Sequence, residues 1–169
     1  MGFWTAVLVT ILAVWFTAAF APYMANLKWD GVEEFAAVFQ SGPYLVWVIP
    51  CLFLALTYPI LAGALYFGAK EGGRFFSFIG LMFGIMYGAI LSTNYWLLAT
   101  VVRGAIINGN TDGLSWLIIG SPFSITNAIE GIGYGFMGLS TLFIGLGFGG
   151  PGLPGWIKKI WVVNELAVS

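Results

Sequence analysis

One carboxyl group, that of Glu130, stands in a segment (residues 121–148) whose other side chains are uncharged and mostly apolar or small. A charge at the centre of a bilayer costs roughly 2.5–3.5 kcal/mol or more, so we expect Glu130 to face protein and to be neutral. Three roles are open to such a group. It can clasp neighbouring helices through hydrogen bonds, belong to a proton or ion pathway, or form a polar contact for a ligand or partner.

Other polar side chains fall at a similar depth along the helices expected around this group. At roughly 1.5 Å per residue, Glu130 and Asn94 each lie about 13 Å from the outer end of their span, and Thr17 is at a similar level. Asn127 and Tyr134 precede and follow Glu130 by three and four residues, so the three share a helix face. We therefore predict an intramembrane polar cluster of Thr17, Asn94, Asn127, Glu130 and Tyr134.

The remaining reactive residues restrict the chemistry further. Arg103 ends the span that carries Asn94 and lies too near the outer surface for a direct ion pair with Glu130. The chain contains no His and a single Cys, Cys51, which follows Pro50 in mid-span without a basic neighbour and should be an inert thiol. With no second carboxylate near Glu130, we expect no catalytic residues, no metal site and no cofactor.

Small residues recur at helical spacing in two of the expected spans. They form a predicted helix-packing groove of Gly80, Gly84, Gly88 and Ser92 in one span and Gly131 and Gly135 in another. Such grooves let helices approach closely, since lipid supplies no hydrophobic drive for their association. The simplest interpretation is that these faces pack together within the bundle. The alternative is that a groove receives a lipid tail, a pigment or another subunit.

The overall composition is that of a membrane protein. Hydrophobic residues make up 60% of the 169 residues and charged residues 8%, and the mean hydropathy is +0.94. Soluble domains carry about 25% charged residues, and a chain of this size could not hide so much apolar surface from water. The net charge of −1 provides no basic surface for nucleic acid. Membrane lipids are therefore the expected surroundings.

Four segments are long enough to cross a bilayer, which takes roughly 20 apolar residues. They are residues 2–24, 44–69, 75–102 and 121–148. The predicted fold class is therefore all-α: a polytopic transmembrane helix bundle in a single domain. The fourth span is expected to begin at Ser121-Pro122, a capping residue followed by proline. Residues 156–169 are too short to span, and form either an interfacial helix or the start of a fifth span.

A short amphipathic helix is expected at residues 31–40, between the first two spans. Asp30 and Glu33 resemble a capping box at its start. Its apolar stripe follows helical spacing and comprises Val32, Phe35, Ala36 and Phe39. Such a helix can rest on the outer leaflet or serve as a docking surface for a partner.

The distribution of basic residues predicts the orientation of the chain. One side of the membrane would hold the N-terminus, Lys70, Arg74, Lys158 and Lys159, and the other would hold Lys28 and Arg103. Because short cytoplasmic loops are richer in Lys and Arg, we expect a cytoplasmic N-terminus.

The stretch NYWLLATVVRGAIINGNTDGLS, followed by SPFSITNAIEGIGYGFMGLSTLF, resembles a family of small uncharacterised multi-pass membrane proteins of bacteria and archaea. The likeness covers residues 75–164 and rests on Asn94, Arg103, Pro122, Glu130 and Gly133-Tyr134. Family members have Asn before the proline and a polar residue near position 98, where this chain has Ser121 and Leu98. That departure makes the cluster less polar and weakens any catalytic interpretation. The resemblance implies five or six spans in a prokaryotic cell membrane, and it implies no activity.

Together these features predict a non-enzymatic integral membrane protein. It would act as a helix-packing subunit of a membrane complex, with other membrane subunits or a second copy as partners, or as a lipid- or small-ligand-binding protein. The alternative is a small transporter or proton-linked membrane protein centred on Glu130. A transporter needs a polar path that water can reach, whereas a subunit needs a free packing face.

Overall fold

The computed structural model describes residues 2–27 and 29–148, and in this part of the chain every regular element is helical. In chain order the elements are α1 (Gly2–Asn26), α2 (Val32–Val38), α3 (Ser41–Gly68), α4 (Glu71–Leu97), a π-helical segment (Leu98–Val102), α5 (Arg103–Ile107), a 3-10 turn (Leu114–Trp116) and α6 (Ile125–Gly147). The predicted all-α fold is confirmed. The helix expected at residues 156–169 lies outside the described residues.

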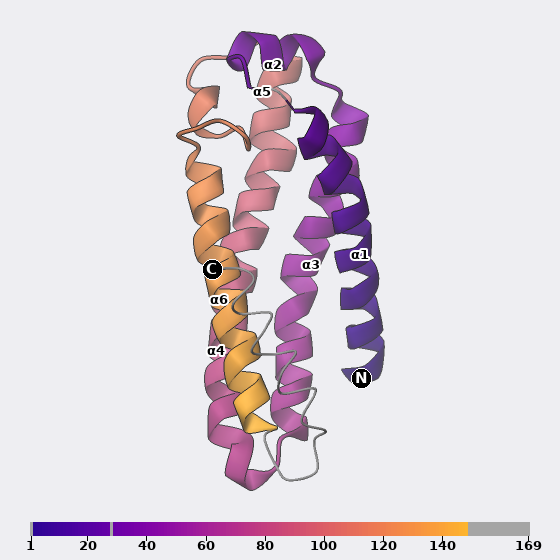
Figure 1. Ribbon diagram of the computed structural model, residues 1–169, viewed down its shortest axis with the longest axis vertical. Coiled ribbons are helices and arrows are strands. Elements are labelled where there is room, and N and C mark those ends of the chain that lie inside the picture. Colours follow the sequence, from indigo (N-terminus) through magenta and orange to yellow (C-terminus); the bar gives the residue numbers. More distant parts are fainter. Residues whose placement is uncertain (1, 28, 149–169) are drawn as a thin grey trace.

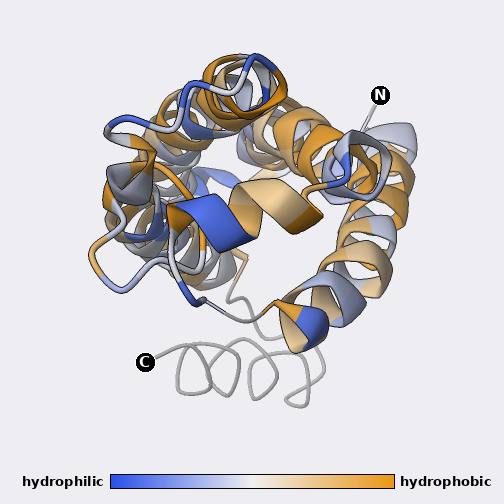
Figure 2. Cartoon of the chain, turned by 90° about the horizontal axis from the view of Figure 1, so that it is seen from above, coloured by the Kyte–Doolittle hydropathy of each residue, from blue (hydrophilic) through white to orange (hydrophobic). Residues whose placement is uncertain are grey.

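Four of these helices are long and apolar enough to cross a membrane: α1, α3, the continuous helix Glu71–Ile107 and α6. They run side by side along the long axis of the molecule, and α2 lies across one end of the bundle (Figure 1). α1 packs on α3, α3 on α4 and α4 on α6, so α1 and α6 form the two ends of the row. Seen from the α2 end, hydrophilic ribbon is concentrated in α2 and the loops, while hydrophobic ribbon follows the long helices (Figure 2). These features indicate an integral membrane protein.

The fourth spanning helix begins later than the sequence predicts. α6 starts at Ile125 with Ser124 as its N-cap, and the Ser124 hydroxyl accepts a hydrogen bond from the Asn127 backbone N–H. Ser121 and Pro122 instead lie in a turn, in which the Ser124 N–H donates to the Ser121 carbonyl. The predicted Ser121-Pro122 cap is wrong because a second capping residue follows three positions later. Glu130 is therefore five residues, or about 7.5 Å, into α6 rather than about 13 Å.

The short helix α2 also begins differently from the prediction. Its N-cap is Gly31 at φ 121°, a conformation that only glycine adopts readily, and no side chain caps the helix. The predicted capping box of Asp30 and Glu33 is therefore wrong. The predicted apolar stripe is confirmed, since Phe35 is buried in the core and the other three members pack against it. This stripe rests on the end of the protein's own bundle.

The glycines of α4 allow close packing of both neighbouring helices. A Cβ at Gly80 would lie 2.8 Å from the Ser140 carbonyl oxygen of α6, and one at Gly88 would clash with Pro59 Cγ of α3. Gly84, between them, faces both helices. The Ser140 hydroxyl donates to the Gly80 carbonyl at 2.6 Å, a bond that the missing side chain permits. The part of the predicted groove formed by Gly80, Gly84 and Gly88 is thus filled by α3 and α6 of the same chain.

Candidate functional site: an intramembrane polar cluster

Four side chains with polar hydrogens or acceptors meet where α3, α4 and α6 adjoin. The Tyr95 hydroxyl of α4 and the Tyr134 hydroxyl of α6 lie 3.0 Å apart. The Glu130 carboxyl of α6 and the Cys51 thiol of α3 lie near the Tyr95 hydroxyl. We call this set the Tyr95 cluster: Cys51, Tyr95, Glu130 and Tyr134.

A tyrosine hydroxyl can donate one hydrogen bond and accept two, so the Tyr95 hydroxyl has capacity for another polar neighbour besides Tyr134. The bond between Tyr95 and Tyr134 joins α4 to α6, and Glu130 and Cys51 lie near it. The cluster therefore brings polar side chains of three helices together in one place.

The cluster is closed on one side and partly open on the other. Tyr95 and Cys51 are each 1% exposed, whereas Glu130 and Tyr134 are half-buried. Tyr87 and Leu91 of α4 are buried and extend the wall around it, with the Tyr87 ring 6.4 Å from the Tyr134 ring. Access to Glu130 is thus along the flank of α6, beside apolar and aromatic side chains.

Asn94 lies next to the Tyr95 cluster and makes a separate link between α4 and α6. Its side-chain amide donates to the Thr126 carbonyl at 3.4 Å, one helical turn from Glu130 toward the start of α6. Asn94 is 2% exposed, and within the described part of the chain its Oδ1 has no hydrogen-bond partner. It therefore joins the same two helices as the bond between Tyr95 and Tyr134.

Two residues of the predicted cluster lie elsewhere. Thr17 is exposed on α1, its hydroxyl bonds to the Ala13 carbonyl of the same helix, and α1 packs on α3. Asn127 is exposed at the start of α6, where its amide donates to the Ser121 carbonyl at 3.3 Å. Their positions along their helices predict a depth close to that of Glu130. Each side chain nevertheless points to a different side of its helix and so lies away from Glu130.

Sequence reasoning missed Tyr95 and the contact of Cys51. Tyr95 follows Asn94 directly, so its depth along the helix could be estimated from the sequence. A single aromatic residue in a membrane span is, however, more often a packing residue than part of a polar site. Cys51 was expected to be an inert thiol, and the structure adds its position against Tyr95. Arg103 begins α5, at the α2 end of the bundle (Figure 1); it is half-buried and donates from Nε to the Ser41 hydroxyl at the start of α3.

One part of the predicted groove is filled by neighbouring helices of the same chain, and the other part is open. Ser92 is half-buried, and its hydroxyl bonds to the Ala89 carbonyl of its own helix. Gly131 and Gly135 are exposed, and in the described structure a Cβ at either position would meet nothing within 4 Å. Gly133 between them does pack, with Leu91 of α4. The face of α6 that points away from α4 therefore carries Gly131 and Gly135 beside the exposed Ile132 and Leu139, and no described residue packs on the two glycines.

The chemistry available at the site is limited to hydrogen bonding and proton exchange. Within residues 2–27 and 29–148 no three His, Cys, Asp or Glu side chains gather as a metal would require. The carboxyl group, the two phenols and the thiol all carry exchangeable protons. None of the hydrogen bonds described joins Glu130 to a positively charged side chain.

Comparisons with known proteins find no relative from which a role could be transferred. No protein-family model matches the chain, and no match is found among curated proteins or solved structures. The resemblance to small multi-pass proteins of bacteria and archaea stays a prediction from the sequence, and these comparisons assign no function to the chain.

Proposed function

We propose that this integral membrane protein is a non-enzymatic subunit of a membrane complex, and that α6 receives a transmembrane helix of a partner chain. The contrast between the two glycine stripes carries the proposal. On α4, Gly80 and Gly88 are filled by helices of the same chain, whereas Gly131 and Gly135 on α6 meet nothing within 4 Å. Small residues spaced in this way let a second backbone approach closely enough for dispersion forces to hold it.

The surroundings of Gly131 and Gly135 fit a helix-docking face. Ala128 precedes Gly131 by three residues and is also exposed, so three small residues lie along this face over about two turns, beside the exposed Ile132. Glu130 is half-buried and lies about 100° around the helix from Gly131, toward α4, so it is not part of this face.

The test is the mass and stability of the complex recovered from the host membrane in mild detergent, read by native mass spectrometry. Gly135→Leu should reduce the complex at least tenfold, as one lost packing contact of about 1.4 kcal/mol would, and leave the single chain folded. Gly68→Leu is the matched control, because Gly68 is also exposed with nothing within 4 Å of its Cβ position. A partner mass of 18.3 kDa would identify a second copy of this chain, and any other mass a different subunit.

Two results would contradict the proposal. One is a wild-type protein that is monomeric in its own membrane. The other is a Gly135→Leu variant that assembles as well as the Gly68→Leu control. A chain ending at Phe148 adds a further check: if only this shortened chain associates, residues 149–169 and not a partner occupy the face.

A second candidate is a proton-linked protein centred on Glu130, favoured by the hydrogen-bonded pair Tyr95 and Tyr134 that lies near it. Three exchangeable groups close together can pass a proton along a short path. Liposomes containing the protein and an internal pH-sensitive dye would report the flux. Glu130→Gln should abolish that flux with assembly intact, while Glu33→Gln on exposed α2 should not. Equal flux in both variants would exclude this candidate.

A further inference from the structure

In the described part of the chain, the carboxyl group of Glu130 has no positive charge to pair with. Lys70 and Arg74 lie at the start of α4, at the end of the bundle opposite α2 (Figure 1). Arg103 donates to the Ser41 hydroxyl at the start of α3. None of these three basic residues is among the groups that lie near Glu130. Carboxyl groups at membrane depth are ordinarily paired, so a cation is the component that this site lacks.

Phenol groups from three helices lie near this carboxyl group. They belong to Tyr44 of α3, Tyr87 and Tyr95 of α4, and Tyr134 of α6. The Tyr87 and Tyr134 rings are 6.4 Å apart. The negative faces of aromatic rings attract ammonium groups, and the attraction is strongest where water is excluded. A carboxyl group among phenol rings therefore combines the two features that bind organic cations.

Two buried oxygen atoms at about the level of Glu130 have no hydrogen-bond partner among the described residues. The Tyr44 hydroxyl, on a residue that is 3% exposed, lies near the carboxyl group. Asn94 Oδ1, on a residue that is 2% exposed, belongs to the amide that donates to the Thr126 carbonyl, one helical turn from Glu130. An amide oxygen and a carboxylate can only accept, and a hydroxyl can accept as well. The site therefore has acceptors to spare and needs a donor.

The carboxyl group can be reached from the bilayer. Glu130 and Tyr134 are half-buried, whereas Tyr95 is 1% exposed. α6 is one end of the row of helices, so part of its surface has no neighbouring helix among the described elements (Figure 1). A molecule dissolved in the apolar part of the membrane can thus reach Glu130 along the flank of α6 without crossing water.

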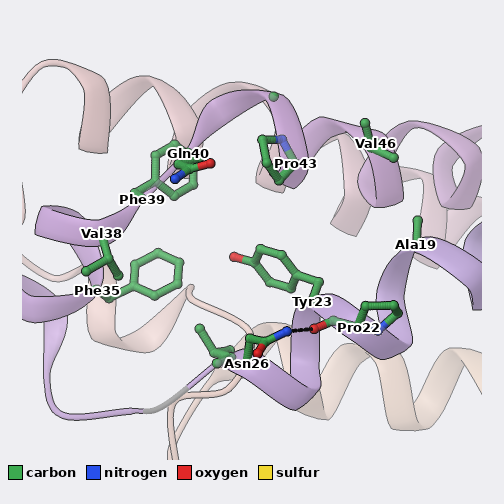
Figure 3. Close-up of a pocket in the computed structure, with 12 residues that line it drawn as sticks. Ala19, Pro22, Tyr23, Asn26, Phe35, Val38, Phe39, Gln40, Pro43 and Val46 are labelled. Atoms are coloured by element: carbon green, nitrogen blue, oxygen red, sulfur yellow. Dashed lines mark hydrogen bonds between the residues drawn. The ribbon is translucent and has the colours of Figure 1, made fainter.

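The open pocket of about 660 Å³ between α1, α2 and α3 is a different place (Figure 3). Its lining contains no charged side chain. Tyr23 and Phe39 of this lining pack on the Tyr44 ring, at centroid distances of 6.1 and 5.1 Å, and Tyr44 itself does not line the pocket. The pocket therefore offers no charge to select a ligand, in contrast to the surroundings of Glu130.

We propose that Glu130 binds the ammonium group of a hydrophobic primary amine, whose apolar part lies in the bilayer along the flank of α6. An ammonium group has three N–H donors and no acceptor, which matches in number the acceptor oxygens offered by Glu130, Tyr44 and Asn94. The amine and the carboxylic acid meet as neutral molecules, and the acid proton passes to the amine nitrogen to form the ion pair. This inference goes beyond the partner helix proposed above, because Glu130 is not part of the face that carries Gly131 and Gly135.

The experiment uses the full chain in phosphatidylcholine nanodiscs, with empty nanodiscs as the background. Equilibrium dialysis measures the binding of radiolabelled hexylamine. Unlabelled hexylamine, hexanol and hexanoate are the competitors, because they share one alkyl chain and differ in charge. Wild type should retain one hexylamine per chain above background, and only unlabelled hexylamine should displace it.

Glu130→Gln should weaken hexylamine binding by about tenfold or more, because the amide cannot pair with the ammonium charge. Glu33→Gln, on the exposed side of α2, is the matched control and should bind as wild type does. Tyr44→Phe keeps the test decisive if Glu130→Gln disturbs the bundle, since it removes one oxygen and leaves the ring in place. It should weaken binding about tenfold, as loss of a hydrogen bond to a charged group does. Tyr66→Phe, near the C-terminal end of α3, is its control.

Three results would overturn the proposal. The first is equal affinity in the Glu130→Gln and Glu33→Gln variants. The second is displacement of hexylamine by hexanol as readily as by unlabelled hexylamine, which would show that the alkyl chain alone is bound. The third is equal affinity in Tyr44→Phe and Tyr66→Phe, which would remove the ammonium group from the side of Glu130 that faces α3. None of these measurements depends on a partner helix, so they fail or succeed independently of the subunit function.

Discussion

The hydroxyl oxygens of Tyr95 and Tyr134 lie 3.0 Å apart across the contact between α4 and α6, the most extensive helix contact in the described bundle. This bond joins the two helices close to Glu130. Because the interior of a bilayer contains no water, polar groups there need hydrogen-bond partners within the protein. Glu130 lies near this pair. The bond therefore stabilises the contact between α4 and α6 close to the one carboxyl group of α6.

The coupling between these two tyrosines can be measured directly. We expect Tyr95→Phe and Tyr134→Phe to be coupled by about 0.6 kcal/mol and at most about 1.7 kcal/mol, the range found for hydrogen bonds between membrane helices. A double-mutant cycle on the free energy of unfolding in a bilayer gives this value. Tyr66→Phe near the C-terminal end of α3 is the control. A coupling of zero would mean that the two hydroxyls do not bond.

Replacing Gly80 should destabilise the bundle much more than replacing Gly135. A methyl group at Gly80 would lie 2.6 Å from Ile144 Cγ1 and 2.8 Å from the Ser140 carbonyl oxygen, whereas at Gly135 it would meet nothing within 4 Å. Overpacking of this kind costs about 1–3 kcal/mol. Thermal unfolding of solubilised Gly80→Ala and Gly135→Ala monomers tests the difference, and equal melting temperatures would contradict the packing described.

The start of α6 can be tested with two serine substitutions. Ser124→Ala should lower stability by about 1 kcal/mol through loss of the N-cap bond to the Asn127 N–H. Ser121→Ala should cost less, because Ser121 contributes its backbone carbonyl, which alanine retains, to the bond with Asn127. Unfolding free energies of the two variants decide between these caps. A larger loss for Ser121→Ala would place the cap where the sequence first indicated it.

Cys51 should be unreactive in the folded protein. Its thiol is buried, with the residue 1% exposed, and it faces Tyr95 in the centre of the bundle. A maleimide reagent of high mass should leave the native protein unlabelled and label it fully after denaturation in SDS, because Cys51 is the chain's single cysteine. Rapid labelling of the native protein, read as a band shift on a gel, would show that α3 is open at this level.

Much of the fold follows from the sequence because lipid imposes a local requirement. A helix that crosses a bilayer must satisfy its own backbone and present apolar side chains over roughly 20 residues. The four spanning helices could therefore be located to within a few residues at most ends. The exceptions were α6, where Ser124 displaced Ser121 as cap, and α4, which continues through a π-helical segment to Ile107.

The site was predictable only in part. Counting residues gave the depth of Glu130 and its pairing with Tyr134 on one helix, because both depend on helical rise and period. Counting could not give the rotation of one helix against another, and this rotation brings Tyr95 to Glu130 and leaves Thr17 exposed on α1.

The sequence by itself determined that this is a helical membrane protein with one carboxyl group in its interior and glycines at packing intervals, since composition and periodicity act residue by residue. Only the tertiary structure decided which glycines are filled, which tyrosine of α4 pairs with Tyr134, and that α1, α2 and α3 line an open pocket. The physical reason is that a packing contact depends on the relative position of two helices, and no single segment of the chain carries that information.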